Sequence, residues 1–238
     1  MSLRPILLLN LIGLLLLLSW WQTLAPFWPA LNAWVFHAFN QTLTADNLGW
    51  VNLVAALNTR TFDAISFLVM VAVLLLAVSR DQREGRLWHW FGVGFVMLFS
   101  AGVIALINNE LPYGHPSPTL YFQSLGEPVN LTTQLVNFST KDTAGNSFPG
   151  DHGMMLMVFA AFMMRFADRP CAILAAAMIP LFSLPRIIAG GHWLEDVFMG
   201  SLSISLLLLP WLLLTPLAPG AVAAIERLAS RLDLPFSR

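Results

Sequence analysis

The chain has 238 residues and a formal net charge of −1, and 57% of its residues are hydrophobic while only 11% are charged. A soluble domain carries about 25% charged residues. This chain has too few to cover its surface with solvated groups, which excludes an ordinary soluble protein. The near-neutral charge gives no reason to expect a nucleic-acid partner. The single cysteine, Cys171, excludes an internal disulfide and a zinc site built from cysteines.

Six apolar runs have the length, or nearly the length, of a membrane-spanning helix, which takes about 20 residues. They lie near residues 5–25, 62–79, 88–107, 151–166, 171–189 and 193–216. The first run also resembles a signal peptide, but it is long and lacks a clear small-residue cleavage site, so we expect it to be retained. Residues 30–58 are expected to lie along the membrane surface. The sequence therefore predicts an all-α, polytopic bundle of six transmembrane helices that forms a single domain, residues 1–238.

The arginines predict how this bundle is oriented. The loop after the second run holds Arg80, Arg83 and Arg86, and the loop after the fourth run holds Arg165 and Arg169. The C-terminal tail is also basic, whereas the loops on the other side carry few lysines or arginines. Because cytoplasmic loops are enriched in these residues, we expect both termini in the cytoplasm, in a bacterial inner membrane whose periplasmic side carries the remaining loops.

Polar side chains gather at the periplasmic ends of the last three runs. The first group is the segment 147–153, where the fourth run begins. The second group is Arg186 with the turn 189–196, which joins the fifth run to the sixth. The order of the runs places both groups on one side of the membrane. Two histidines, an arginine and two aspartates are therefore expected to converge at one depth.

These residue types suit the transfer of a phosphoryl group. Asp196 follows His192 by four residues, and if the sixth helix begins here both side chains project from one face of it. A carboxylate bound to one ring nitrogen fixes the tautomer and leaves the other nitrogen free to attack. Arg186 offers a planar, permanently charged fork for phosphoryl oxygens. His152 could protonate a leaving oxygen, and the backbone N–H groups beside it, with Ser147, could cradle a phosphate. The set fits transfer through a phosphohistidine.

On these residues alone, other interpretations stay open. A histidine–aspartate pair at helical spacing is more often a structural hydrogen bond than a catalytic pair. His152, His192 and the aspartates could bind a metal, because imidazole and carboxylate suit several metals. Arg186 could extend to lipid headgroups instead of holding a phosphate.

Two segments resemble signatures of the type 2 phosphatidic acid phosphatase superfamily. Arg186, His192 and Asp196, separated by five and three residues, resemble its last signature, and the segment 147–152 resembles its central one. The resemblance implies a six-helix bundle without a metal or other cofactor. It implies His192 as the nucleophile, Asp196 as its partner and His152 as the general acid. It also implies that Arg186 and the segment 147–152 hold the phosphate, with Ser147, Gly150 and Asp151 among the residues around it.

The chain departs from the superfamily pattern in two places. The superfamily usually has serine and then glycine before the central histidine, where this chain has Gly150 and Asp151. Its first signature is a lysine followed seven residues later by arginine and proline. Placing that arginine on His115 puts Asn108 at the lysine, so two fixed positive charges are missing. Lys141, the only lysine, is predicted to supply one of them, and His115 is grouped with the phosphate-binding residues.

Within the superfamily, the chain resembles the branch of lipid A 1-diphosphate synthases over most of its length. The matching segments are residues 60–63, 117–120, 140–142, 147–156, 209–211 and 214–217. The resemblance implies a ping-pong transfer from undecaprenyl diphosphate to the 1-phosphate of lipid A, which releases undecaprenyl phosphate. Both lipids would reach the site sideways from the surrounding membrane lipids.

Two rival functions stay open. A hydrolase of undecaprenyl diphosphate or of another lipid phosphate would use the same phosphohistidine with water as the acceptor. A lipid transporter or non-enzymatic scaffold would instead place polar residues near the middle of the spans, where this chain has few, such as Asn10. A small regulatory membrane protein is a further partner that the sequence leaves open and does not identify.

Overall fold

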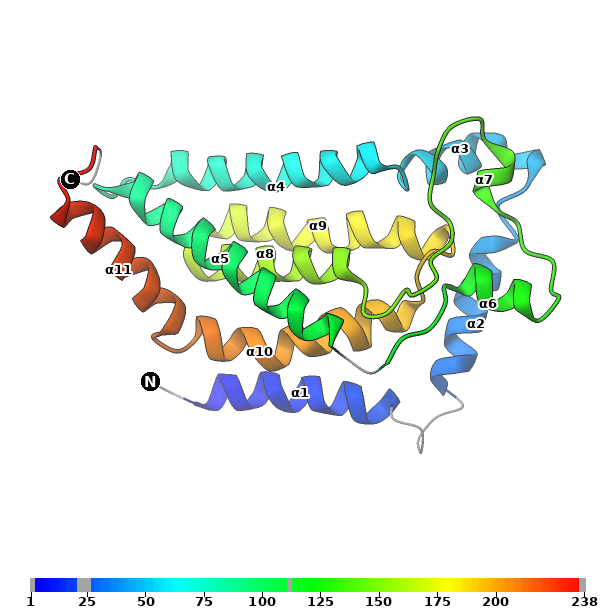
Figure 1. Ribbon diagram of the computed structural model, residues 1–238, viewed down its shortest axis with the longest axis horizontal. Helices are drawn as coiled ribbons and strands as arrows, with labels where there is room; N and C mark the ends of the chain where they lie inside the picture. The colour runs from blue at the N-terminus through cyan, green and yellow to red at the C-terminus, as the bar shows by residue number, and fades with distance from the viewer. Residues whose placement is uncertain (1–2, 21–26, 111–112, 236–238) are drawn as a thin grey trace.

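The computed structural model describes residues 3–20, 27–110 and 113–235, and the described residues contain helices and no strands (Figure 1). The elements in chain order are α1 Arg4–Trp20, α2 Phe27–Asn40, η1 Ala45–Asn47, α3 Leu48–Ala56, α4 Arg60–Arg80, α5 Arg86–Asn109, α6 Pro118–Ser124, α7 Thr132–Leu135, α8 Asp151–Phe166, α9 Arg169–Ile188, η2 Asp196–Leu202, α10 Ser203–Leu213 and α11 Leu217–Arg231. The predicted all-α architecture is confirmed.

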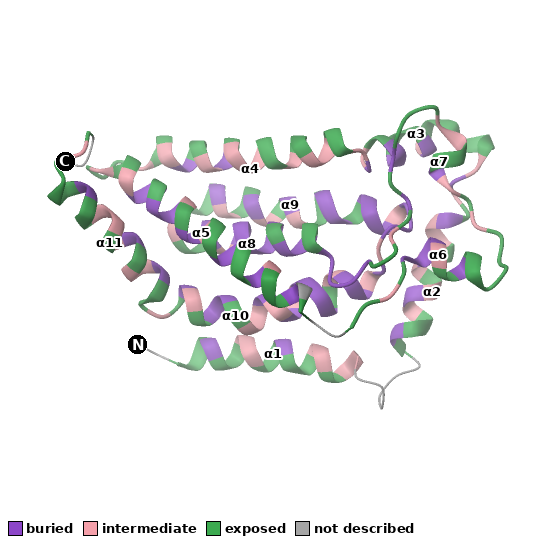
Figure 2. Cartoon of the chain, viewed as in Figure 1, coloured by how far each residue is buried: buried purple, intermediate pink, exposed green. Residues whose placement is uncertain are grey.

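Helix α8 lies at the centre of the bundle, and its side chains are mostly buried (Figure 2). Phe162 and Met163 are fully buried in a core to which α4, α5, α9, α10 and α11 also contribute. The helix has 16 residues and is therefore about 24 Å long, which is short for a bilayer core of about 30 Å. Its apolar sequence is explained by contact with neighbouring helices, which surround it on most sides.

Within the described residues, four helical stretches are long and apolar enough to span a membrane. They are Arg60–Arg80, Arg86–Asn108, Arg169–Ile188 and Asp196–Leu213, and Arg4–Trp20 is apolar but shorter. Large apolar side chains such as Leu8, Leu68 and Phe99 are more than half exposed on the outside of the bundle. Contiguous apolar surface of this kind needs lipid around it, so the protein is a membrane protein.

The predicted runs differ from the observed helices mainly at their ends. Helix α1 is described as far as Trp20, and residues 21–25 of the first predicted run lie outside the described residues. The sixth run consists of the π-helical segment η2 followed by α10, and it ends at Leu213 instead of residue 216. Pro216 explains the early end, because a proline disfavours helical backbone in the residue before it.

Helix α11 was not predicted, since the sequence beyond residue 216 was interpreted as a basic tail. The helix packs on α5 (Figure 1) and buries Ala218, Val222 and Ala229. These residues recur at spacings of four and seven, which marks one face of a helix. The signal is weak because two of the three are alanines, which contribute little to an apolar pattern.

Short helices and long loops cover the end of the bundle that holds α2, α3, α6 and α7 (Figure 1). Side-chain amides join these segments: Asn40 and Asn130 exchange hydrogen bonds with each other's backbone. The amide of Asn58 donates to the carbonyl of Pro185, near the end of α9. These bonds tie the segment between α6 and α7 to the end of α2, and the turn before α4 to the end of α9.

Helix α1 is held to α10 by close packing and by a polar side chain. The Asn10 amide donates to the carbonyls of Leu206 and Leu207, and the Trp211 indole donates to the Asn10 amide oxygen. A Cβ atom at Gly13 would lie 3.1 Å from the Cβ of Leu206. Small residues and interhelical hydrogen bonds are the usual means by which helices associate in lipid.

We expect Gly13→Leu to lower the melting temperature of the purified protein in detergent, because the larger side chain forces α1 away from α10. Overpacking of this kind costs about 1–3 kcal/mol. Gly102→Leu on α5 is the matched control, since a Cβ there meets nothing within 4 Å. Equal melting temperatures for the two variants would contradict the packing of α1 described above.

Candidate active site

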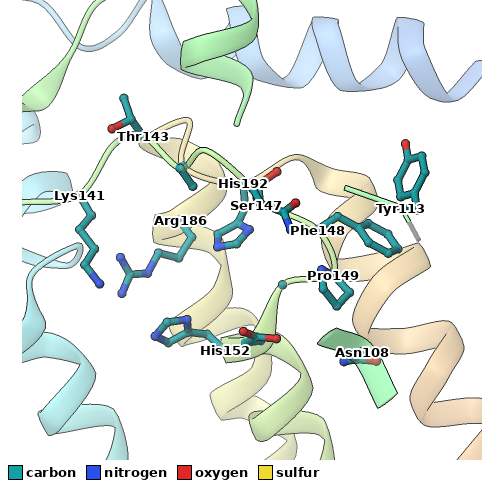
Figure 3. A pocket seen from close by; sticks show the side chains of 15 residues that line it. Asn108, Tyr113, Lys141, Thr143, Ser147, Phe148, Pro149, His152, Arg186 and His192 are labelled. Carbon is teal, nitrogen blue, oxygen red and sulfur yellow. The ribbon is translucent and has the colours of Figure 1, made fainter. Parts of the chain in front are cut away.

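A polar cavity of about 400 Å³ opens where the loop 136–150 meets the ends of α8 and α9 (Figure 3). Most of the predicted site residues line it, namely Lys141, Ser147, Gly150, Asp151, His152, Arg186 and His192. They come from three separate parts of the chain, and Figure 3 shows Lys141, Arg186, His152 and His192 around one common space. Asp196 lies behind His192, and His115 does not line this cavity.

His192 and Asp196 form the pair that their spacing predicts. The Nδ1 atom of His192 lies 3.2 Å from Oδ2 of Asp196, and the backbone N–H of Trp193 donates to the same oxygen at 2.8 Å. Asp196 is fully buried. Because Nδ1 faces the carboxylate, Nε2 is the ring nitrogen left for the cavity. The geometry is that of a nucleophile held in one tautomer.

Arg186 and His152 share one partner, Asp63, in the first turn of α4. The guanidinium of Arg186 donates to Oδ1 of Asp63, and Nε2 of His152 lies 3.5 Å from the same oxygen. Arg186 is 6% exposed, so its charge is buried and needs this partner. Asp63 was matched only as part of the segment 60–63, without a role. An acidic residue at the start of an apolar span is the signal that marks it.

The turn before α8 requires a glycine at position 150. Gly150 has a φ of +77°, and a Cβ there would lie 3.2 Å from the Asp196 carbonyl oxygen. The Ser201 hydroxyl donates to the carbonyls of Pro149 and Gly150, which ties this turn to η2. The first N–H groups of α8 have no partner within the helix and face a site suited to an anion. The departure from the superfamily serine therefore fits the local backbone.

Ser147 is engaged with the protein itself. Its N–H donates to the carbonyl of His115 at 2.9 Å, and its hydroxyl lies 3.3 Å from the same oxygen. Ser147 is 2% exposed. In this arrangement the side chain fixes the loop instead of presenting its hydroxyl to a ligand.

Lys141 reaches the cavity from a loop whose backbone is anchored on both sides. Its N–H donates to the carbonyl of Asn58 at 3.0 Å. The neighbouring Thr140 hydroxyl donates to Ala55, and the Asp142 carboxylate accepts hydrogen bonds from Thr133. Lys141 itself is exposed and lines the cavity.

His115 lies behind Asp196, on the side away from His192. Its Nε2 atom is 3.1 Å from Oδ1 of Asp196 and 3.7 Å from Oε1 of Glu195. Burial opposes a charge on the ring, but Asp196 and Glu195 outweigh it and raise the pKa of His115. Burial raises the pKa of Glu195. The sequence grouped His115 with the phosphate-binding residues, whereas the structure brings it to the buried carboxylates.

Further residues that line the cavity have no predicted role in the site, among them Asn108, Tyr113, Thr143 and Asn146. Asn108 stands where the superfamily has its first lysine, and it is 4% exposed. Among the described residues, no group of three or more histidine, cysteine, aspartate or glutamate side chains is arranged to hold a metal ion.

Comparison with known proteins supports the two signatures. A profile of the PAP2 superfamily matches residues 114–220. The chain is 37% identical over 228 residues to lipid A 1-diphosphate synthase of Escherichia coli (strain K12), covering 95% of this chain and 94% of the relative. No solved structure matches the chain significantly. The superfamily resemblance inferred from the segments around His152 and His192 is confirmed.

We expect Asp63→Asn to destabilise the protein, because Arg186 loses its ionic partner while it stays buried. Loss of a charged hydrogen-bond partner costs about 1–3 kcal/mol. Added inorganic phosphate should raise the melting temperature of this variant more than that of the unaltered protein, since the anion can then pair with Arg186.

The matched control is Asp168→Asn, which alters a more exposed ion pair with Arg80. Exposed pairs contribute about 0–1 kcal/mol, so this variant should melt close to the unaltered protein. If both variants melt alike, and phosphate stabilises neither of them more than the unaltered protein, Asp63 does not serve as the partner of Arg186.

Proposed function

The chain belongs to the PAP2 superfamily, and on that premise we propose that it is a phosphotransferase acting between lipids. It moves the terminal phosphate of undecaprenyl diphosphate onto the 1-phosphate of lipid A, giving lipid A 1-diphosphate and undecaprenyl phosphate. The observation that carries the proposal is His192, held on the buried Asp196 with its second nitrogen toward a cavity that also contains Arg186. Similarity along nearly the whole chain to a lipid A 1-diphosphate synthase supports the choice of lipids.

In the first step, Nε2 of His192 attacks the terminal phosphorus of undecaprenyl diphosphate. The N–P bond forms as the bond from phosphorus to the bridging oxygen breaks, and undecaprenyl phosphate leaves. Asp196 keeps the proton on Nδ1 and stabilises the positive charge that develops on the ring. Arg186, Lys141 and the N–H groups at the start of α8 neutralise the phosphoryl oxygens. His152 lies beside the cavity in a position to protonate the leaving oxygen.

In the second step, an oxygen of the 1-phosphate of lipid A attacks the phosphorus of the phosphohistidine. The N–P bond breaks, His192 is regenerated, and the product carries a diphosphate at the 1-position. Water attacking in place of lipid A would give free phosphate, so the acceptor decides between transfer and hydrolysis. Asp151, at the rim of the cavity, carries a negative charge where an incoming water or phosphate would pass.

An apolar groove beside the cavity supports lipid-linked substrates. It holds about 220 Å³ and is lined by apolar side chains of α4, α8 and α9, among them Phe62, Met70 and Phe182. Asp151 and His152 line both this groove and the polar cavity, so the two spaces adjoin. A hydrocarbon chain in the groove would place its phosphate head beside His152, and the lipid would arrive from the side of the bundle.

The membrane arrangement that we propose has six spans within a single domain, residues 1–238, in a bacterial inner membrane. Helices α1 and α8 supplement the four long spans, α8 as a short helix enclosed by its neighbours. The arginines Arg80, Arg165 and Arg169 then lie at the cytoplasmic end. His192 and the cavity lie at the opposite end, which faces the periplasm.

We expect purified protein to transfer label from undecaprenyl diphosphate, labelled in its terminal phosphate, to the 1-position of lipid A. His192→Ala should abolish both the transfer and the labelled protein intermediate, because the alanine side chain has no nitrogen that could form a bond to phosphorus. His37→Ala, an exposed histidine of α2, is the control and should retain activity. Label recovered only as free phosphate would make the protein a hydrolase, and no release at all would favour a transporter or scaffold.

We expect Lys141→Met to raise the KM for undecaprenyl diphosphate by about tenfold, the effect of losing one charged contact, with little change in kcat. Lys141→Arg should keep the KM near its original value because it retains the charge. Initial rates over a range of donor concentrations separate the two parameters. An unchanged KM in the methionine variant would remove Lys141 from the phosphate site.

A further inference from the structure

Four side chains form a continuous row behind the catalytic cavity: Glu195, His115, Asp196 and His192. His115 stands between the two carboxylates, with Nε2 3.1 Å from Asp196 and 3.7 Å from Glu195. Asp196 in turn lies 3.2 Å from Nδ1 of His192. The row therefore connects the nucleophile to a second carboxylate through a second imidazole.

The two oxygens of the Asp196 carboxylate have different partners. Oδ2 accepts the N–H of Trp193 and faces Nδ1 of His192. Oδ1 is fully buried and has no hydrogen-bond partner among the described residues, and Nε2 of His115 lies 3.1 Å from it. A buried carboxylate oxygen without a charged or hydrogen-bonded partner is costly. Nε2 of His115 is likewise buried without a hydrogen-bond partner, so a proton on this nitrogen would give both atoms a charged partner across 3.1 Å.

Glu195 is positioned to favour a proton on Nε2 of His115. Its Oε2 atom accepts the Asn32 amide at 2.6 Å and the Trp20 indole at 3.1 Å. Its Oε1 atom is left for His115. Burial favours the neutral form of Glu195 and raises its pKa, and the nearby ring of His115 opposes this by favouring the ionised carboxylate.

His115 has its own access to solvent. It lines a second cavity of about 330 Å³ together with Tyr113, Trp193 and Glu195, and its side chain is 17% exposed. The cavity that holds Arg186 and His152 is not lined by His115. A proton can therefore reach this ring while a substrate fills the catalytic cavity.

We propose that His115, charged by its pairing with Glu195, is a positioning residue that keeps Asp196 ionised and oriented against His192. This proposal rests on the function proposed above. In the superfamily pattern the position of His115 is an arginine, which is charged at every working pH. A histidine there makes the support of Asp196 depend on pH, and it acts on the nucleophile from behind instead of contacting the phosphate.

The direction of the pH dependence follows from the neighbours of His115. The charged groups that face the ring are Glu195 and Asp196, with His192 beyond Asp196. The nearby Tyr113 ring stays neutral, because burial and these carboxylates raise the pKa of Tyr113 to about 12. Since the pKa of His115 is raised, its charge is complete below the ordinary value of about 6.5. The charge is lost as the pH rises through the raised value.

The test measures kcat and KM for label transfer against pH in the full-length protein. His115→Gln should lower kcat by about 10- to 100-fold, the effect of losing a partner that orients a functional side chain, with KM within about twofold. In the unaltered protein kcat should decline at alkaline pH as His115 loses its proton. This decline should be absent from His115→Gln. His115→Arg restores a fixed charge and should recover kcat without that decline. His37→Gln, which changes an exposed histidine paired with Glu127, should leave both parameters and the profile unchanged.

Glu195→Gln provides a test that keeps His115 in place. The glutamine retains an acceptor for Trp20 but removes the charge beside His115, so the alkaline decline should move to lower pH by about 1–3 units. An alkaline decline at the original pH in this variant would overturn the proposal. A raised KM with unchanged kcat in His115→Gln would also overturn it, and would place His115 on the phosphate.

A readout without catalysis separates this proposal from the proposed function. If His115 is charged in the folded protein, the unaltered protein should melt above His115→Gln by the largest margin near pH 6. The margin should shrink as the pH rises through the raised pKa of His115. A margin that does not change with pH counts against the charged ring. If the protein transfers no phosphate but its melting temperatures show this pattern, the proposed function is refuted while the charged pair of His115 and Glu195 stands.

Discussion

A carboxylate buried at the start of a membrane-spanning helix is the constraint on which the rest of the site depends. Asp196 is fully buried, and an isolated charge in such a place is strongly unfavourable. The protein surrounds it with a backbone N–H from Trp193 and with two imidazoles, His192 and His115. The orientation of the nucleophile is thus a consequence of how the buried charge is satisfied.

The same demand explains why several distant elements meet here. Arg186 is buried near the end of α9 and takes its partner, Asp63, from the first turn of α4. Ser201 in η2 binds the carbonyls of the turn that precedes α8. Each contact satisfies a buried polar group and also joins two helices, so the charges and hydrogen bonds of the site hold its end of the bundle together.

The degenerate first signature has a structural explanation as well. The chain lacks the lysine and arginine of the superfamily pattern, and Asn108 and His115 stand in their places. The cavity instead receives a positive charge from Lys141, whose backbone is anchored on Asn58. His115 lies outside this cavity, with Nε2 3.1 Å from Oδ1 of Asp196. The roles of Lys141 and His115 stay predictions, and the experiments above distinguish contact with the phosphate from support of Asp196.

The sequence by itself determined the features that local spacing controls. Apolar runs predicted the helices of the bundle, because a helix in lipid must be apolar along its length. The four-residue spacing of His192 and Asp196 predicted their contact, although His192 lies in the bend before the helix, so the two side chains meet across a turn and not along a helix face. The order of the runs was enough to expect Arg186 and His152 near one another. The superfamily and the class of reaction followed from these local patterns.

Tertiary structure alone decided the contacts between segments far apart in the chain. Asp63 precedes Arg186 by 123 residues, and no periodicity links the two. His115 reaches Asp196 and does not line the cavity that contains Arg186, because the loop that carries it packs against α2 and the turn before η2. Glu195 lies between His192 and Asp196 in sequence, yet its partners Asn32 and Trp20 lie more than 160 residues away. Such pairings depend on how the helices pack, and a linear pattern carries no record of that packing.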